Sequence, residues 1–208
     1  MSKDIVVNPF DQDALYLSRL IAGEATSNEQ GYSVAMNSDR TYAVIGSYLD
    51  SSMAKQAGTA FIFRRKNDQW THESTLLPDD YAPYDSFGNA VGIDKKGTTV
   101  VVGAYMDSTF RTNGGAVYVF RKRDLRWKQQ SKLFSPSGKG FEFFGNQVFI
   151  NDEGSVLVVE TEPSQEPTKK TPKYYLFRKH FQAWNHEESF DTLDRSMTEL
   201  LKDRFTGG

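Results

Sequence analysis

The chain has 208 residues, with 25 Lys and Arg against 27 Asp and Glu, so its formal net charge of −2 points to no particular partner and does not favour nucleic acid. Aromatic residues make up 13% of the sequence and charged residues 25%, which is typical of a folded domain rather than of a disordered chain. The absence of cysteine excludes disulfides, thiol catalysis and thiolate metal sites.

Residues 1–26 are predicted to be an N-terminal arm. Acidic residues interrupt the start, MSKDIVVNPFDQD, before any apolar stretch is long enough for a signal peptide, and no later stretch approaches the roughly 18 apolar residues of a membrane span. We therefore expect no signal peptide, no membrane insertion, and a cytoplasmic protein or a part of an intracellularly assembled particle. Within the arm, the pattern fits either an extra strand at residues 14–21 or a short amphipathic helix over residues 13–23.

The rest of the chain is repetitive, because its three tryptophans, Trp70, Trp127 and Trp184, are 57 residues apart. The same interval links further positions: Gly31, Gly88 and Gly145; Val34, Val91 and Val148; Phe63, Phe120 and Phe177; Arg64, Arg121 and Arg178. A fixed period without insertions indicates one structural unit that is repeated. The sequence therefore predicts three equivalent units, at about 31–77, 88–134 and 145–190, within a segment that covers residues 27–190.

Each unit consists of short β-branched and aromatic runs separated by Gly, Asp and Asn, which is the pattern of strands and tight turns. The middle unit predicts four strands, at about Asn89–Ile93, Thr98–Tyr105, Ala116–Arg121 and Trp127–Phe134. The second and third of these are apolar at consecutive positions, so both of their faces must be covered. The fourth is mainly polar after its leading Trp, as an outer edge in contact with water would be.

A small antiparallel sheet that is buried in its middle and wet at one edge is the blade of a β-propeller. The predicted fold class is therefore all-β and propeller-like, with three four-stranded antiparallel blades. The alternative is a β-sandwich built from a repeated meander, which would place one wet face on each strand.

The motifs of the middle unit resemble those of FG-GAP repeats, the blade type of the integrin α-chain propeller. They are Phe87-Gly88, Gly103-Ala104-Tyr105 and Gly114-Gly115-Ala116-Val117-Tyr118-Val119-Phe120. The first unit has Gln30 in place of the phenylalanine, and the third has Glu160-Thr161-Glu162-Pro163 in place of the second motif, so the third unit is the most diverged. The resemblance implies a propeller, but propellers of this family serve adhesion, assembly and occasionally catalysis, so it does not select a function.

Some FG-GAP blades bind calcium between their first two strands, through a D-x-D-x-D-G run that resembles an EF-hand loop. The corresponding turns here are shorter, at residues 37–40, 94–97 and 151–154, and they carry too few carboxylates. Hairpin turns in which Asn, Asp and Gly tolerate positive φ explain them better. We therefore expect no metal site and no cofactor.

Catalytic and nucleic-acid-binding patterns are also missing. The three histidines, His72, His180 and His186, have no metal-binding or catalytic spacing, so no catalytic residue is assigned. Basic clusters recur at Arg64-Arg65-Lys66 and Arg121-Lys122-Arg123. Because the net charge is close to zero, solvated turns explain these clusters better than a nucleic-acid interface does.

The long connections are predicted to share one end of the blades, because successive connections in an antiparallel meander alternate between its two ends. These long loops cover residues 48–56, 78–86, 105–113, 135–143 and 162–171. Long loops on a rigid scaffold commonly carry binding sites, and aromatic residues and Arg are enriched in interface hot spots. The candidate partner-binding residues are Tyr48, Asp50, Tyr81, Tyr84, Tyr105, Asp107, Phe110, Arg111, Phe141 and Phe143. The alternative, that these side chains only plug the blade junctions, remains open.

The C-terminal segment, residues 191–208, is predicted to contain a short amphipathic helix over residues 192–205, with Leu193, Met197, Leu200, Leu201 and Phe205 on one side. Closed propellers have about 4–8 blades, so three blades leave two apolar sides to be covered. We therefore expect a homo-oligomer, most simply a dimer.

These features favour a non-enzymatic module that binds another protein or serves in assembly, for example as a component of a virion or of another large assembly. The competing hypothesis is a carbohydrate-binding lectin, or an enzyme, that uses the same long loops. The sequence itself does not identify the ligand.

Overall fold

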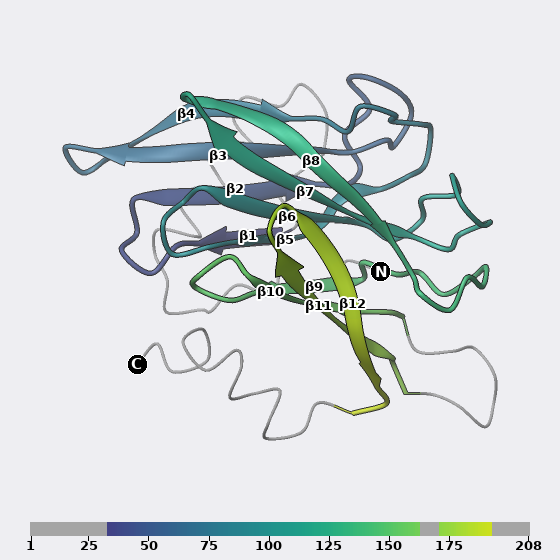
Figure 1. Cartoon of the computed structure of the whole chain (residues 1–208). Helices are drawn as coiled ribbons and strands as arrows, with labels where there is room; N and C mark the ends of the chain where they lie inside the picture. Colours follow the sequence, from purple (N-terminus) through teal and green to yellow (C-terminus); the bar gives the residue numbers. More distant parts are fainter. Residues whose placement is uncertain (1–32, 163–170, 193–208) are drawn as a thin grey trace.

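The computed structural model describes residues 33–162 and 171–192. Its strands form three four-stranded antiparallel sheets, in each of which the strands lie side by side in chain order (Figure 1). Within these two ranges there is no helix, and therefore none that could cross a membrane. The predicted strand at residues 14–21, its alternative helix over 13–23, and the predicted helix at 192–205 lie outside the described residues, apart from Thr192.

The three sheets are the predicted blades, and we call them blades 1, 2 and 3. Blade 1 contains β1 (Ser33–Met36), β2 (Tyr42–Ser47), β3 (Thr59–Lys66) and β4 (Gln69–Leu76). Blade 2 contains β5 (Phe87–Ile93), β6 (Thr99–Ala104), β7 (Ala116–Arg123) and β8 (Arg126–Phe134). Blade 3 contains β9 (Gln147–Ile150), β10 (Val156–Glu160), β11 (Tyr174–His180) and β12 (Ala183–Phe190).

The four strands predicted for the middle unit are confirmed to within two residues at every end. Every residue of β5 and β6 is buried, so both faces of these strands are covered. This burial confirms blades and excludes the β-sandwich alternative, in which each strand would have one wet face. Each blade also has a register irregularity at the same place in its third strand, between Ile62 and Phe63, Val119 and Phe120, and Leu176 and Phe177.

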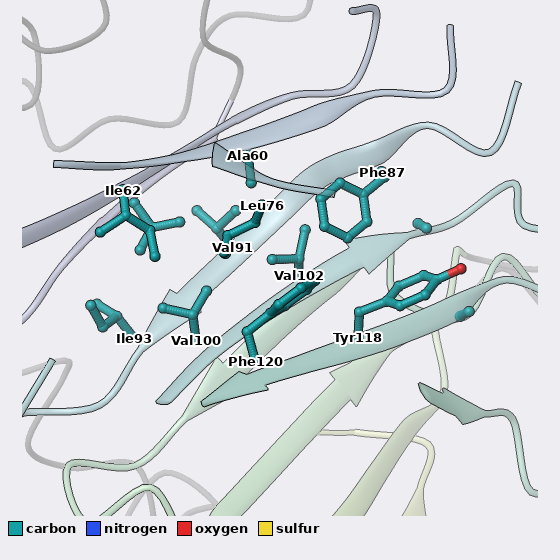
Figure 2. Close-up of a cluster of buried hydrophobic side chains, with 13 residues drawn as sticks. Ala60, Ile62, Leu76, Phe87, Val91, Ile93, Val100, Val102, Tyr118 and Phe120 are labelled. Atoms are coloured by element: carbon teal, nitrogen blue, oxygen red, sulfur yellow. The ribbon is translucent and has the colours of Figure 1, made fainter. Parts of the chain in front are cut away.

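The hydrophobic core lies between successive blades. We call the side of a blade that packs on the preceding blade its incoming side, and the opposite side its outgoing side. Ala60, Ile62 and Leu76 on the outgoing side of blade 1 belong to one cluster with Val102 and Phe120 on the incoming side of blade 2 (Figure 2). A second cluster joins blades 2 and 3 in the same way. The stack is therefore held together by apolar contact between sheets.

Glycines set how closely two blades approach each other. A Cβ atom on Gly46 would stand 2.0 Å from the carbonyl oxygen of Gly88, and one on Gly103 would stand 2.1 Å from that of Gly145. Both partner glycines have left-handed backbone, with φ of 91° and 93°. The two glycine motifs of the repeat are therefore the two halves of one backbone contact between neighbouring blades.

Blade 3 lacks this contact on its outgoing side. Its equivalent of Gly46 and Gly103 is Glu160, and its equivalent of Gly58 and Gly115 is Pro172. In blade 2, Asn89 donates from Nδ2 to the carbonyl oxygen of Gly145 at 2.9 Å. In blade 3, the equivalent Asn146 donates from Nδ2 to the Glu160 carboxylate at 3.3 Å. The Glu160 side chain therefore takes the role that the Gly145 carbonyl has at the junction between blades 2 and 3.

The substitution Gly103→Ala is expected to lower the free energy of unfolding by about 3 kcal/mol or more, because its Cβ meets a backbone oxygen that cannot move aside. Urea denaturation measures this loss. Gly138→Ala is the control, because a Cβ there has no heavy atom within 4 Å. It should cost only the roughly 1 kcal/mol of a left-handed alanine. Equal losses in the two variants would contradict the glycine-contact interpretation.

Candidate functional site: the long-loop face

The long loops of blades 1 and 2 form one continuous layer, which we call the long-loop face and define as residues 48–58, 77–86, 105–115 and 135–143. Backbone hydrogen bonds link each blade-to-blade loop to the loop before it. The amide of Tyr84 donates to the carbonyl oxygen of Lys55 at 2.8 Å, and the amide of Phe141 donates to that of Thr112 at 2.9 Å. The same spacing of 57 residues separates the two bonds, so the loops repeat as faithfully as the strands do.

Four of the ten predicted partner-binding residues are exposed aromatics on this face. They are Tyr81, Tyr84, Phe110 and Phe141, with exposed fractions between 40% and 65%. Tyr84 and Phe141 occupy equivalent positions, and both have left-handed backbone, with φ of 70° and 58°. A bulky residue with left-handed backbone is strained, and such strain persists where surrounding contacts fix the residue, often at binding or active sites.

Neighbouring cations and rings contact two of the exposed aromatics, Phe110 and Tyr84. The Phe110 ring lies 5.2 Å from that of Phe134, measured between centroids, and the Arg111 guanidinium lies 4.3 Å from the Phe110 centroid. Arg111 also donates from Nε to the carbonyl oxygen of Gly138 at 3.0 Å. The ammonium of Lys55 lies 5.4 Å from the Tyr84 centroid. The aromatic side chains therefore stand on an ordered support.

Four other predicted residues are half-buried and shape the loops. Tyr105 and Phe143 lie 6.2 Å apart between ring centroids. Asp50 accepts the amide of Ser52 at 2.8 Å and so closes its own turn. Tyr48 is also half-buried at the start of its loop. Tyr105 and Phe143 therefore pack on each other within the loop layer, and their contact with a partner stays a prediction.

The expectation that Asp107 faces a partner does not hold. This residue is 1% exposed, and its carboxylate accepts the Tyr118 hydroxyl at 2.8 Å and lies 2.8 Å from the Lys132 ammonium. The sequence placed Asp107 correctly in a long loop, but not the two side chains that neutralise it. The carboxylate can be buried here because Lys132 and the Tyr118 hydroxyl offset the cost of removing its charge from water.

Two further aspartates complete an ionic cluster beneath the long-loop face, which comprises Asp80, Asp85, Asp107, Tyr118 and Lys132. Asp80 accepts a hydrogen bond from the Lys132 ammonium at 2.7 Å, and its Oδ1 lies 3.0 Å from the Tyr118 hydroxyl, whose one proton Asp80 and Asp107 share. Asp85 accepts the amide of Ala82 at 2.8 Å. The sequence analysis did not select Asp80, Asp85 or Lys132. The sequence held a signal for Asp85 alone of these three, because the residue 57 positions later, Glu142, is also acidic. In the structure, Glu142 accepts a hydrogen bond from the hydroxyl of Tyr175, the blade 3 equivalent of Tyr118, at 3.2 Å.

Burial is the largest single influence on the pKa of Asp80, Asp85 and Tyr118. Burial, and then the neighbouring Asp107 carboxylate, raise the pKa of Asp85 to about 6. Burial and the two carboxylates also raise the pKa of Tyr118 far above its usual range, so it stays a hydroxyl donor. For Asp80, burial acts upward but is outweighed by the hydrogen bonds from Lys132 and Tyr118, so its pKa is lowered. The cluster links two loop segments, the one with Asp80 and Asp85 and the one with Asp107, to strands β7 and β8 of blade 2.

The turns at residues 37–40, 94–97 and 151–154 use their oxygens to close themselves. Asp94 Oδ1 accepts the amides of Thr98 and Thr99 at 2.7 and 3.0 Å, and Asn151 Oδ1 accepts two amides in the same way. In the described part of the chain, no three His, Asp or Glu side chains are grouped so that they could hold a metal ion.

The substitution Asp85→Asn is expected to stabilise the protein at pH 8. The folded-state pKa of Asp85 is raised, so its favourable contribution is complete at low pH and is lost as the pH rises through about 6. A neutral amide avoids this loss, on the order of 2 kcal/mol, and keeps an oxygen for the Ala82 amide. Urea unfolding at pH 4.5 and pH 8 measures the difference. The same pH dependence in both proteins would contradict the assignment.

Residues 70–120 match the sequence model of the FG-GAP repeat. The matched stretch runs from β4 of blade 1 through β7 of blade 2, so it crosses a blade junction and contains both Gly88 and Gly103. No curated protein matches the chain. Together with the three four-stranded sheets, the match shows that the chain contains FG-GAP-type β-propeller blades, a fold that commonly serves protein interaction.

One solved structure supports the fold, and nothing beyond the fold. A protein from Bacteroides fragilis, described as a candidate 6-phosphogluconolactonase, has a TM-score of 0.54 and 12% identity, and the match covers 80% of this chain and 40% of that one. Hydrazine synthase from Kuenenia stuttgartiensis has a TM-score of 0.48 and 12% identity over 77% of this chain and 36% of that one. The chain therefore spans less than half the length of either structure.

Proposed function

We propose that the chain is a non-enzymatic protein-binding module whose long-loop face docks on a macromolecular partner. The observation that carries the proposal is the set of four exposed aromatic side chains on one ordered surface, Tyr81, Tyr84, Phe110 and Phe141. Exposed aromatics with an adjacent Arg are the composition of interface hot spots.

The order of this surface supports the proposal as much as its composition does. Tyr84 and Phe141 are held in strained backbone, and Phe110 is packed between a ring and a guanidinium. Side chains that are fixed before binding lose little conformational entropy on binding, which favours affinity. The ionic cluster beneath them supports the loops. Its carboxylates are paired with Lys132, the Tyr118 hydroxyl or a backbone amide, so a scaffold role explains it without catalysis.

The test compares partners captured by the wild-type chain and by the double variant Tyr84→Gly, Phe141→Gly. Glycine removes the aromatic side chains and also relieves the left-handed backbone, so the free energy of unfolding should change by only about 1 kcal/mol. Quantitative mass spectrometry of proteins captured from cells that make the chain should show at least one partner that the double variant loses by tenfold or more.

The control is the double variant Leu125→Ala, Phe181→Ala. These residues are 84% and 102% exposed, and they lie on the turns between third and fourth strands, at the other end of the blades. This variant should retain the partner. Equal loss in both variants would contradict the proposal. Binding to a glycan array that Tyr105→Ala abolishes would instead support the lectin hypothesis.

We further propose that the chain associates with itself through its terminal blades, as a component of a larger assembly. The incoming side of blade 1 carries a buried apolar cluster of Ala43, Ile45, Phe63 and Trp70. The outgoing side of blade 3 carries another, of Val156, Val158 and Leu176. Among the described residues, neither cluster has a member from another blade. Both clusters are already buried within the single chain, so self-association would have a neighbouring chain's blade replace what covers them. A ring of several blades buries two apolar sides of this kind.

Sedimentation velocity of the full chain over a range of micromolar concentrations tests self-association, and a dimer or larger species is expected. Glu160→Gly restores the glycine of the other two junctions and should tighten the association if the outgoing side of blade 3 takes part. A monomer for both the wild type and Glu160→Gly would contradict the proposal.

A further inference from the structure

Each blade places a cation over its tryptophan on its incoming side. Arg65 lies 5.9 Å from the ring centroid of Trp70, Lys122 lies 5.8 Å from that of Trp127, and Lys179 lies 5.7 Å from that of Trp184. The three pairs are related by the 57-residue period. The two described blade junctions can therefore be compared position by position.

At the junction between blades 1 and 2, one carboxylate serves both members of the pair. The Lys122 ammonium lies 2.6 Å from Oε1 of Glu73, on the outgoing side of blade 1. Trp127 donates from Nε1 to the same oxygen at 3.2 Å. Lys122 also contacts the Tyr42 hydroxyl at 2.9 Å. The cation and the indole N–H are therefore both satisfied by an acidic side chain built into the chain.

At the junction between blades 2 and 3, that carboxylate is missing, because the equivalent of Glu73 is Gln130. The Lys179 ammonium is 3.5 Å from the amide oxygen of Gln130 and forms no ion pair among the described residues. Trp184 is only 8% exposed, and its Nε1 is buried without a hydrogen-bond partner among them. Lys179 and Trp184 are the equivalents of Lys122 and Trp127. They therefore have no carboxylate in the place that Glu73 fills at the junction between blades 1 and 2.

Two further cations face the same place from blade 2. Arg121 and Arg123 lie on the outgoing side of β7, across the junction from Lys179, and neither forms an ion pair among the described residues. Burial, followed by Arg121 and Arg123, lowers the pKa of Lys179, and Asp94 offsets this only in part. Asp94 already accepts the amides of its own turn. Three cations at this junction therefore face one carboxylate, that of Asp94, and it forms no ion pair with any of them.

We propose that the junction between blades 2 and 3 binds an oxyanion in the place that the Glu73 carboxylate fills at the junction between blades 1 and 2. Lys179, Arg121 and Arg123 supply the positive charge, and Trp184 Nε1 supplies a neutral donor. Arg123 donates from Nη2 to Oε1 of Gln182 at 2.8 Å, and its other N–H groups are left for the anion. A phosphate dianion suits three cations and several donors, because charge-assisted hydrogen bonds to its oxygens are strong. Inorganic phosphate is therefore the probe.

Thermal unfolding in sodium phosphate and in sodium chloride of matched ionic strength tests the site. The melting temperature of the wild type should rise by about 3 °C more in phosphate than in chloride. Gln130→Glu installs the carboxylate of the first junction, so it should raise the melting temperature in chloride and abolish the extra rise in phosphate. The reciprocal variant, Glu73→Gln, should gain a phosphate response at the first junction.

Two results would overturn the proposal: an equal rise of the wild type in phosphate and in chloride, or a full phosphate response retained by Gln130→Glu. If a variant fails to fold, the indole N–H signals of the wild type in a ¹H–¹⁵N spectrum decide. Phosphate should shift the Trp184 signal and leave that of Trp127 in place, because Glu73 already occupies its acceptor position. An unmoved Trp184 signal would also overturn it.

Discussion

The approach of a glycine Cα to the carbonyl oxygen of the next blade is the constraint on which the rest of the structure depends. No side chain fits at Gly46 or Gly103, because a Cβ would stand about 2 Å from a backbone oxygen. Two backbones therefore touch at the loop end of each junction, where Gly58 bridges Phe87 and Gly115 bridges Phe144. This spacing brings the valines and phenylalanines of neighbouring sheets into contact, and it lays the long loops against one another.

The repeat makes the molecule its own control, because equivalent positions lie on corresponding strands of three four-stranded sheets and can be compared side chain by side chain. Where the residues agree, as in the cation over each tryptophan, the role is structural. Where they differ, the local chemistry changes with them. In blade 3, Glu160 stands at the position of the junction glycines Gly46 and Gly103, and its carboxylate accepts the Asn146 amide. In blade 2, Gln130 stands at the position of Glu73, the residue of blade 1 that neutralises Lys122. These two departures mark the places where blade 3 and its junction do something that the other blades do not.

The long-loop face combines a rigid support with a strained, exposed surface. Beneath it, carboxylates are paired with Lys132 and the Tyr118 hydroxyl, which fixes segments from two different connections. Above, Tyr84 and Phe141 are held exposed in left-handed backbone. Natural proteins tolerate such strain where the surrounding contacts compensate for it, and exposed aromatic side chains add a cost in water. A surface that keeps both the strained backbone and the exposed aromatic side chains is suited to binding.

The sequence by itself determined the period, the strands and the blade architecture, because alternation of apolar runs with turn residues is a local property. It also placed Tyr84 and Phe141 at one end of the blades, since the ends of an antiparallel meander alternate. Only the tertiary structure decided which side chains meet across a junction. The burial of Asp107 against Lys132, 25 residues away, and the pairing of Glu73 with Lys122 depend on how one sheet stacks on the next. A pattern within one strand carries no information about that distance.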